Sequence, residues 1–365
     1  MKFNIYCNSM NPCDGGIQNT AYLFFEEICK QHDIRGFSSY LPKQFKRERI
    51  DEVKEVNRIN TTKWLLKNSD EKTWNIVMNV WMGIPAYIVS KIKKTHYFVL
   101  VHGEDVYKNM YTVHGIKKKL LMKINEIILK NADFVACNSE YTKKKAEQFC
   151  PFGKYIIIHP PCTKYNVSKN TDIDKKMVVS IGRIVERKGF QYVIRAIDIL
   201  RIQYSDIQYY ILGTGSYERK LRFLVDELNL NQHVHFLGQV NENIKIKYLE
   251  RCALLAMPSI ELENDCTVEG FGIVFIEANQ FGKYVLASNS GGIPDAIIDG
   301  VTGSIIEDVS GDNVAKQISK IIEEHDKYYK ESMINRRKEW ASQHTSINII
   351  QKYYNAIENT LNAID

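Results

Sequence analysis

The stretch Glu269–Glu277 reads Glu-Gly-Phe-Gly-Ile-Val-Phe-Ile-Glu, so that two carboxylates stand eight positions apart with a Gly-x-Gly step between them. A polar loop precedes it, and the apolar segment that follows stops at Gly282, a residue type that often ends helices. The pattern predicts a loop that carries Glu269 and a short helix that starts near Gly272 and carries Glu277. Free N–H groups and the helix dipole at such a start attract anions, including a diphosphate.

The spacing of the two carboxylates suits a nucleotide diphosphate sugar. Eight residues at helical rise span about 12 Å, which is about the distance from a hexose on one side of a diphosphate to a ribose on the other. One carboxylate would accept hydrogen bonds from sugar hydroxyls and the other from ribose hydroxyls. A plain surface helix with two glutamates has the same spacing, so the interpretation depends on the surrounding chain.

Length and composition are those of a globular protein with two domains. The chain has 365 residues, of which 44% are hydrophobic and 25% charged. No apolar run reaches the roughly 18 residues of a membrane span, and the N-terminus reads as one short strand rather than a signal peptide. The eight cysteines are scattered without a Cys-x-x-Cys, which indicates neither a zinc site nor a disulfide framework. We therefore expect a reducing, cytoplasmic setting.

The positive charge lies in the first half of the chain. Residues 1–165 hold 26 Lys and Arg against 16 Asp and Glu, whereas residues 166–365 hold 23 against 27. An excess of basic residues in one half of a chain is typical of a surface that binds nucleic acid, an anionic membrane or an anionic substrate. No nucleic-acid motif is present, so nucleic acid is not an expected partner. The segment Ile116–Lys130 sets five lysines beside apolar residues at helical spacing, which is typical of a helix on an anionic membrane surface and also of a domain helix with a solvated lysine face.

Short β-type segments alternate with glycine turns and helical segments along both halves. This predicts an α/β protein of two doubly wound, Rossmann-like domains facing an interdomain cleft. We expect an N-terminal domain over residues 1–165, a polar linker over 166–176, a C-terminal domain over 177–340 and a final helix over 341–365 that crosses back to the first domain. Asp172 and Asp174 form an Asp-x-Asp inside the polar linker, which is a poor place for a metal site.

Charged residues and glycines follow several expected strands. Arg183 and Lys188 come after the strand Met177–Ile181, at a turn where their charges can neutralise a diphosphate. Gly213 opens a Gly-Thr-Gly turn after the next strand, and His102 follows the strand Tyr97–Val101 in the first half. In α/β folds such strand ends are where ligands bind.

Taken in order, these residues resemble the retaining family-4 glycosyltransferases of GT-B fold. The resemblance rests on Gly182-Arg183, Lys188-Gly189, Gly213-Thr214-Gly215, Phe236-Leu237-Gly238, Pro258-Ser259, Glu269–Glu277 and Gly291-Gly292-Ile293-Pro294, and in the first half on Gly15-Gly16, His102-Gly103 and Ala132-Asp133-Phe134. Trp340 and the segment Ile347–Asn359 are similar to the part of those enzymes that returns to the first domain.

The resemblance implies a role for each matching position. Glu269, His102, Arg183 and Lys188 would be catalytic, with Glu269 and His102 at the transferred sugar and the two cations at the diphosphate. The donor would also be bound by Gly16, Gly213, Gly238, Val240, Gly270, Phe271, Gly272, Ile273, Val274 and Glu277, the last at the ribose hydroxyls. No cofactor and no metal are expected. The acidic loop Glu261–Thr267 is expected to close over the sugar.

The predicted function is the transfer of a hexosyl group, with retention, from a UDP- or GDP-sugar to a hydroxyl of a glycan or lipid-linked glycan. We expect this step to serve bacterial surface polysaccharide or lipopolysaccharide synthesis, in the cytoplasm at the inner face of the membrane. A sugar-nucleotide 2-epimerase of the same architecture and a non-catalytic partner subunit are the alternatives. A nicotinamide oxidoreductase is disfavoured because the Gly213 turn lacks the acidic residue about 20 positions further on.

Overall fold

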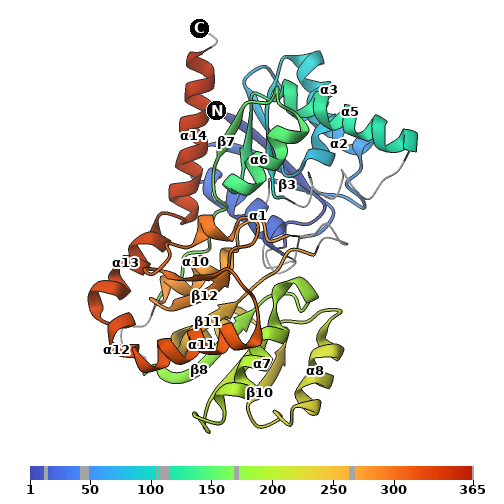
Figure 1. The fold of residues 1–365 in the computed structure, drawn as a ribbon. Helices are drawn as coiled ribbons and strands as arrows, with labels where there is room; N and C mark the ends of the chain where they lie inside the picture. The colour runs from blue at the N-terminus through green and yellow to red at the C-terminus, as the bar shows by residue number, and fades with distance from the viewer. Residues whose placement is uncertain are drawn as a thin grey trace. The chain divides into compact units, whose positions relative to one another are not determined.

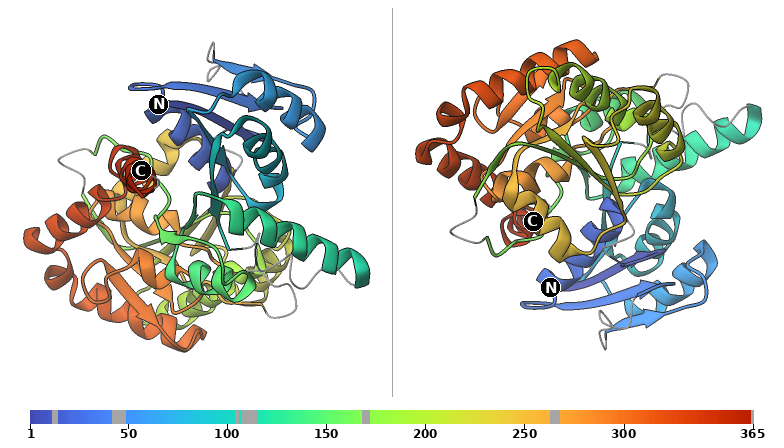
Figure 2. Two further views of the ribbon diagram at one scale, coloured as in Figure 1. Left: turned by 90° about the horizontal axis from the view of Figure 1, so that it is seen from above. Right: turned by 90° about the horizontal axis from the view of Figure 1, so that it is seen from below.

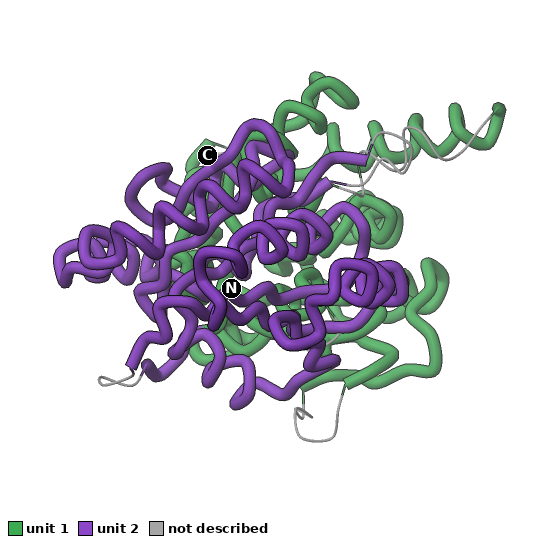
Figure 3. The backbone as a smooth tube through the Cα atoms, turned by 60° about the horizontal axis from the view of Figure 1, so that its bottom comes forward, with its two compact units in different colours: residues 1–163, 344–365 green, residues 164–343 purple. Residues whose placement is uncertain are grey.

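A computed structural model describes residues 1–11, 15–41, 49–103, 106, 115–167, 172–262 and 268–363. The chain divides into two compact units. Unit 1 comprises residues 1–163 and 344–365, and unit 2 comprises residues 164–343 (Figure 3). The first boundary lies just before the linker expected at 166–176, and strand β8 already begins at Asp174, inside that expected linker.

Unit 1 is built on a sheet of seven parallel strands in the order β3-β2-β1-β4-β5-β6-β7. The strand order reverses direction at β1, which is the doubly wound arrangement. The strands are β1 (Lys2–Cys7), β2 (Asp33–Ser38), β3 (Ile50–Glu52), β4 (Thr73–Val77), β5 (His96–Val101), β6 (Phe134–Cys137) and β7 (Tyr155–Ile157).

Helices cover both faces of this sheet (Figure 2). Side chains alternate across each strand, so Phe3 and Ile5 of β1 join one hydrophobic core while Tyr6 joins the other. The first core is closed by α1 (Gly16–Ile28) and α14 (Ser346–Asn362), and the second by α2 (Arg58–Asn68), α3 (Gly83–Lys93), α5 (Gly115–Asn131) and α6 (Glu140–Phe149). A short 3-10 helix, η2 (Val80–Met82), follows β4.

The last helix, α14, is part of the unit 1 core although it is farthest along the chain (Figure 1). Tyr353 meets Phe24 of α1 edge to face, with the ring centroids 4.7 Å apart. Ile349, Ile350 and Ile357 are fully buried with it. Unit 1 therefore takes its core from both ends of the sequence.

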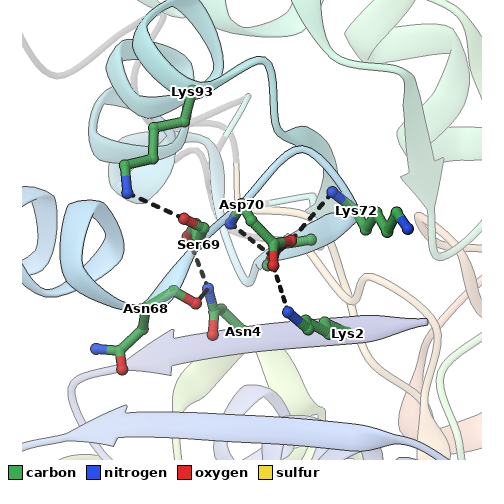
Figure 4. Close-up of polar contacts among 8 residues, drawn as sticks. Lys2, Asn4, Asn68, Ser69, Asp70, Lys72 and Lys93 are labelled. Atoms are coloured by element: carbon green, nitrogen blue, oxygen red, sulfur yellow. Dashed lines mark hydrogen bonds and ion pairs between the residues drawn. The ribbon is translucent and has the colours of Figure 1, made fainter.

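The amino-terminal ends of β1 and β4 carry a polar cluster (Figure 4). The side-chain amide of buried Asn4 donates to the Ser69 hydroxyl at 2.9 Å, and the Lys93 ammonium donates to the Ser69 carbonyl at 3.2 Å. Lys2 forms an ion pair with Asp70, and their hydrogen bond lowers the pKa of the Asp70 carboxyl. The cluster lies at the amino-terminal edge of the unit 1 sheet, opposite to the carboxyl edge, which is followed by the predicted site residues Gly16 and His102.

Unit 2 is a second parallel sheet, in the order β10-β9-β8-β11-β12-β13, with the reversal at β8. Its strands are β8 (Asp174–Ile181), β9 (Gln208–Leu212), β10 (Val234–Gly238), β11 (Cys252–Met257), β12 (Tyr284–Ser288) and β13 (Gly303–Ile306). Its helices are η3 (Glu186–Lys188), α7 (Phe190–Leu200), α8 (Glu218–Glu227), α9 (Glu242–Arg251), α10 (Ile273–Gln280), η4 (Ile293–Ala296), α11 (Gly311–Glu323), α12 (His325–Tyr328) and α13 (Glu331–Ser342).

The predicted fold class, two doubly wound Rossmann-like domains, is confirmed by these two sheets. The elements β2, β3, α2, α3, α6 and α9 were not predicted from the sequence. Polar residues are the reason for most of these omissions: β2 includes Asp33 and Arg35, and α6 buries only Thr142 and Ala146. Their place in the fold comes from pairing and packing with neighbours that are distant in sequence.

Candidate functional site

The ends of β8, β9 and β10 lie side by side at the carboxyl edge of the unit 2 sheet. The Gly182 amide donates to the Leu212 carbonyl at 2.9 Å, and the Gly213 amide donates to the Gly238 carbonyl at 2.8 Å. Gly213 has φ +142°, and a Cβ there would lie 1.9 Å from the Gly182 carbonyl oxygen. No side chain therefore fits between these turns, and the predicted Gly213 and Gly238 occupy neighbouring strand ends.

The turn after β8 carries three basic side chains. Arg183 is exposed and has no ion-pair partner among the described residues. Arg187 and Lys188 lie on η3, and both form ion pairs with Glu269. At Gly189, which has φ +78°, a Cβ would lie 2.0 Å from the Pro258 carbonyl oxygen, so this glycine allows η3 to approach the end of β11.

Glu269 is an ionised carboxylate held by two cations. Its Oε2 atom accepts from Arg187 Nη1 at 3.1 Å and from the Lys188 ammonium. Burial alone would raise the pKa of Glu269, but the charges of Lys188 and Arg187 outweigh burial and lower it to about 2. The Gly292 amide donates to the Glu269 carbonyl at 2.8 Å, so the turn after β12 also fixes the Glu269 backbone.

Lys188 and Glu269 were predicted from the sequence as site residues, whereas Arg187 was missed. The sequence feature that could have indicated Arg187 is that it is a second basic residue next to Lys188 in the same turn. Arg187 is only 7% exposed, and a buried guanidinium is rarely without a carboxylate partner. The partner stands 82 positions away, however, and the sequence does not name it.

The short helix expected after Gly272 is α10, which starts at Ile273. Gly272 has φ +93°, and no side chain of the described residues caps the helix start. The Phe275 amide donates to the Gly272 carbonyl at 3.0 Å, so among these residues the amides of Ile273 and Val274 lack the capping partners that most helix starts have. Phe271 is buried, and Gly270, Ile273 and Val274 are half-buried. This part of the backbone is suited to bind an anion.

Glu277 stands one helical turn inside α10 and is 8% exposed. Its Oε1 atom accepts from the Tyr165 hydroxyl and from the Lys245 ammonium, each at 2.9 Å. Lys245 belongs to α9, which begins two residues after the predicted Val240. Neither Tyr165 nor Lys245 was predicted from the sequence.

Gly16 and His102 lie in unit 1, at the carboxyl ends of β1 and β5. Gly16 is the first residue of α1. The His102 ring is half-buried, and its Nε2 atom lies 2.9 Å from the Met78 carbonyl. Since a carbonyl only accepts, Nε2 carries a proton. The predicted contacts of Gly16 and His102 with a donor held by unit 2 stay predictions.

Most of the acidic loop expected to close over the sugar, residues 263–267, lies outside the described residues. Within the described ranges no group of three or more His, Cys, Asp or Glu side chains is placed to hold a metal ion, and Asp174 accepts from the backbone amide of Lys176 at 3.1 Å. None of the described helices has both the length and the apolarity of a membrane span.

Comparison with known proteins identifies the family. Residues 163–340 match the family model described as glycosyl transferases group 1. A GDP-mannose-dependent monoacylated alpha-(1-6)-phosphatidylinositol monomannoside mannosyltransferase of Corynebacterium glutamicum is 32% identical over 266 residues, which is 67% of either chain. The chain belongs to the group 1 glycosyl transferases. The predicted enzyme class, a hexosyltransferase, is confirmed by this membership.

Further relatives of this glycosyltransferase extend over most of its length. A GDP-mannose-dependent alpha-(1-6)-phosphatidylinositol monomannoside mannosyltransferase of Mycolicibacterium smegmatis is 25% identical over 350 residues, covering 86% of this chain and 87% of the relative. Two solved structures share the fold at 17% identity. HepE of Anabaena, in complex with UDP, superposes with a TM-score of 0.77 over 98% of this chain and all of the other. Sucrose-phosphate synthase of Thermosynechococcus elongatus does so with 0.76 over the whole of both chains. The predicted GT-B fold is thereby confirmed.

Proposed function

We propose that this glycosyltransferase moves a hexosyl group, with retention at the anomeric carbon, from a nucleotide diphosphate sugar to a hydroxyl of a glycan or lipid-linked glycan. The names of the mannosyltransferase relatives make GDP-mannose the first donor to test, and UDP-sugars the second. The acceptor class follows the same relatives, whose names give a phosphatidylinositol mannoside. The pathway we propose is surface glycan synthesis at the inner face of the cell membrane.

The observation that supports the proposal most is the grouping of charges in unit 2. The Glu269 carboxylate, its cations Arg187 and Lys188, the start of α10 and Glu277 all follow strands of one sheet. Cations and the amides of an uncapped helix start can bind a diphosphate. The two carboxylates can accept hydrogen bonds from the hydroxyls of the sugar and of the ribose on either side of it. A solvated surface helix would not need buried partners for both carboxylates.

The chemistry follows from where charge develops. When the bond between the anomeric carbon and the diphosphate oxygen breaks, its electron pair leaves on the diphosphate. Arg183, Lys188 and the first amides of α10 stabilise that charge, and preorganised groups of this kind often provide the largest part of catalysis. These groups supply the positive charge that a metal ion would otherwise bring, so we propose a reaction without a metal cofactor.

A membrane-linked acceptor is supported by the surface of α5 in unit 1. Ile116 and Leu120 of this helix are 87% and 62% exposed. They stand beside Lys117 and Lys119 in the first turns of the helix, where no acidic residue occurs. Exposed apolar side chains next to lysines suit the boundary of an anionic membrane. We therefore propose a peripheral contact through α5.

A donor screen that measures nucleotide release from GDP-mannose and from UDP-sugars tests the transfer. Lys188→Met is expected to reduce turnover with the selected donor about 100-fold or more, since it removes a charge from the leaving group. The matched control is Lys316→Met, at an exposed position of α11, which is expected to leave turnover unchanged. Equal turnover in the two variants would remove Lys188 from the site, and conversion of the sugar without an acceptor would favour an epimerase.

Flotation with liposomes tests the membrane contact. Full-length protein is expected to float with vesicles that contain anionic lipid and to lose most of this binding when Lys117→Glu and Lys119→Glu are combined. Each charge near the surface contributes about 1 kcal/mol. The control combines Lys316→Glu and Lys320→Glu on α11, which makes the same change of charge in unit 2. Equal recovery of both variants would contradict a role of α5.

A further inference from the structure

The carboxylate of Glu277 is held from one side only. The Tyr165 hydroxyl and the Lys245 ammonium both donate to Oε1, each at 2.9 Å. No group of the described residues donates to the second oxygen, Oε2. A carboxylate oxygen has two lone-pair sites, so Oε2 can accept from both hydroxyls of a vicinal diol.

Tyr165 is fixed to the helix that carries Glu277. Its backbone amide donates to the side chain of Gln280 at 3.0 Å, and its ring packs against Phe281 at a centroid distance of 5.4 Å. Gln280 ends α10 and Phe281 is its C-cap residue. Tyr165 is thus tied to the end of α10 by its backbone and ring, and its hydroxyl contacts Glu277 on the same helix.

Lys245 completes the arrangement from α9. Its ammonium lies 5.2 Å from the centre of the Tyr165 ring, within the range of a cation–π contact. It also pairs with Glu242 at 3.0 Å. Burial alone would lower the pKa of Lys245, but Glu277 and Glu242 raise it above its ordinary value. Lys245 is therefore charged at neutral pH, and it compensates the buried charge of Glu277.

We propose that Tyr165 and Lys245 are positioning residues that direct Oε2 of Glu277 toward the ribose hydroxyls of the donor nucleotide. The inference rests on the proposed function, in which Glu277 is the ribose ligand. Without the Tyr165 hydroxyl the carboxylate loses its orientation, and without Lys245 it loses its countercharge. In both cases the hydrogen bonds to the ribose weaken while the groups around the diphosphate stay intact.

The test compares binding of GDP and 2′-deoxy-GDP by calorimetry, or of the uridine pair if the donor screen selects UDP-sugars. Wild-type protein is expected to bind the ribonucleotide about tenfold tighter or more, which is the scale of a hydrogen bond to a charged group. Tyr165→Phe, which removes one hydroxyl, is expected to reduce this ratio to about threefold. Lys245→Met is expected to bring the ratio close to one, and Lys245→Arg to restore part of it.

Matched controls separate positioning from general damage. Lys247→Met removes an exposed ammonium from the same helix, and Tyr204→Phe removes a hydroxyl that donates to Glu323 at 3.0 Å elsewhere in unit 2. Both controls are expected to keep the wild-type ratio. With the intact donor, Tyr165→Phe and Lys245→Met should raise KM and leave kcat nearly unchanged, because the ribose does not react. Should Lys245→Met fail to fold, Tyr165→Phe decides alone.

The outcomes distinguish the inference from the proposed function. If wild-type protein prefers the ribonucleotide, and Tyr165→Phe and Lys245→Met keep that preference in full, the positioning role is wrong while the nucleotide site stands. If wild-type protein binds neither nucleotide, the proposed function is wrong, and the positioning role that rests on it is wrong as well. A ratio that collapses in these variants and persists in both controls supports the positioning role.

Discussion

At the scale of single residues, the carboxylate of Glu269 depends on two cations from one turn. Its Oε2 atom is bonded by both Arg187 and Lys188. A donor diphosphate would compete with Glu269 for the ammonium of Lys188. Arg187 then remains as the partner of Glu269, so that Lys188 can move to the diphosphate without leaving a buried charge uncompensated. On the proposed function, Arg187 would therefore keep Lys188 available for the diphosphate.

The shared carboxylate predicts the effect of Arg187→Met. The variant is expected to lose about 1–3 kcal/mol of stability, because a buried carboxylate loses one of its two charged partners. Donor affinity is expected to fall about tenfold, since Lys188 is then retained by Glu269. Urea unfolding and the KM for the donor measure the two effects. Arg219→Met, at an exposed position of α8, is the control, and an equal change in both variants would contradict this role of Arg187.

The low pKa of Glu269 predicts a dependence of stability on pH. The folded protein lowers this pKa from 4.5 to about 2, so the native state favours the ionised carboxylate. The stabilisation is complete above the unfolded value of 4.5 and is lost as the pH falls from there toward 2. The free energy of unfolding of wild-type protein should therefore fall more steeply over this range than that of Glu269→Gln. Parallel curves for the two proteins would contradict the assignment.

At the scale of elements, the sequence predicts most readily what burial makes apolar. The strands β5, β11 and β12 are almost fully buried and read as short apolar runs, whereas β2 and α6 are polar on their exposed side. The start of α10 is predictable as well, because a glycine step directly before an apolar segment is typical of a helix start. Whether a side chain caps that start depends on the three-dimensional structure and cannot be read from the local sequence.

The conformation at the start of α10 predicts the effect of Gly272→Ala. A Cβ at Gly272 would lie 2.5 Å from the Phe275 ring, and the positive φ adds strain. We expect a loss of about 1–3 kcal/mol in stability and a weaker diphosphate contact, because the first turn of α10 must shift. Gly300→Ala is the matched control, since Gly300 also has a positive φ, +72°, but no atom lies within 4 Å of its Cβ position. Thermal unfolding without nucleotide measures the loss of stability, and the shift of the unfolding temperature on adding nucleotide measures the diphosphate contact. Equal destabilisation would show that φ alone is responsible.

At the scale of the whole molecule, the chain forms two compact units, and unit 1 is built from two separate segments, residues 1–163 and 344–365. The two segments next to the unit boundaries meet inside unit 1, where the Cys162 amide donates to the His344 carbonyl at 2.8 Å. Strand ends of a parallel sheet share an edge whatever their distance in sequence, which is why the sequence could indicate that Lys188 and Glu269 lie close together. Arg187, Tyr165 and Lys245 were not predictable, because the carboxylates that they contact lie 82, 112 and 32 positions away.

The return of α14 to unit 1 predicts that a substitution near the C-terminus weakens the N-terminal sheet. Ile350 is 1% exposed in the core of unit 1, whereas Ile347, one turn earlier, is 55% exposed. Ile350→Ala is expected to cost about 2–5 kcal/mol, and Ile347→Ala less than about 0.5 kcal/mol. Hydrogen exchange followed by mass spectrometry should show faster exchange in β1, β4 and β5 of Ile350→Ala, while β8, β11 and β12 keep the wild-type rate and nucleotide binding is retained. Equal acceleration in both sheets would mean that the two units unfold as one cooperative block, in which the separate cores do not set separate stabilities.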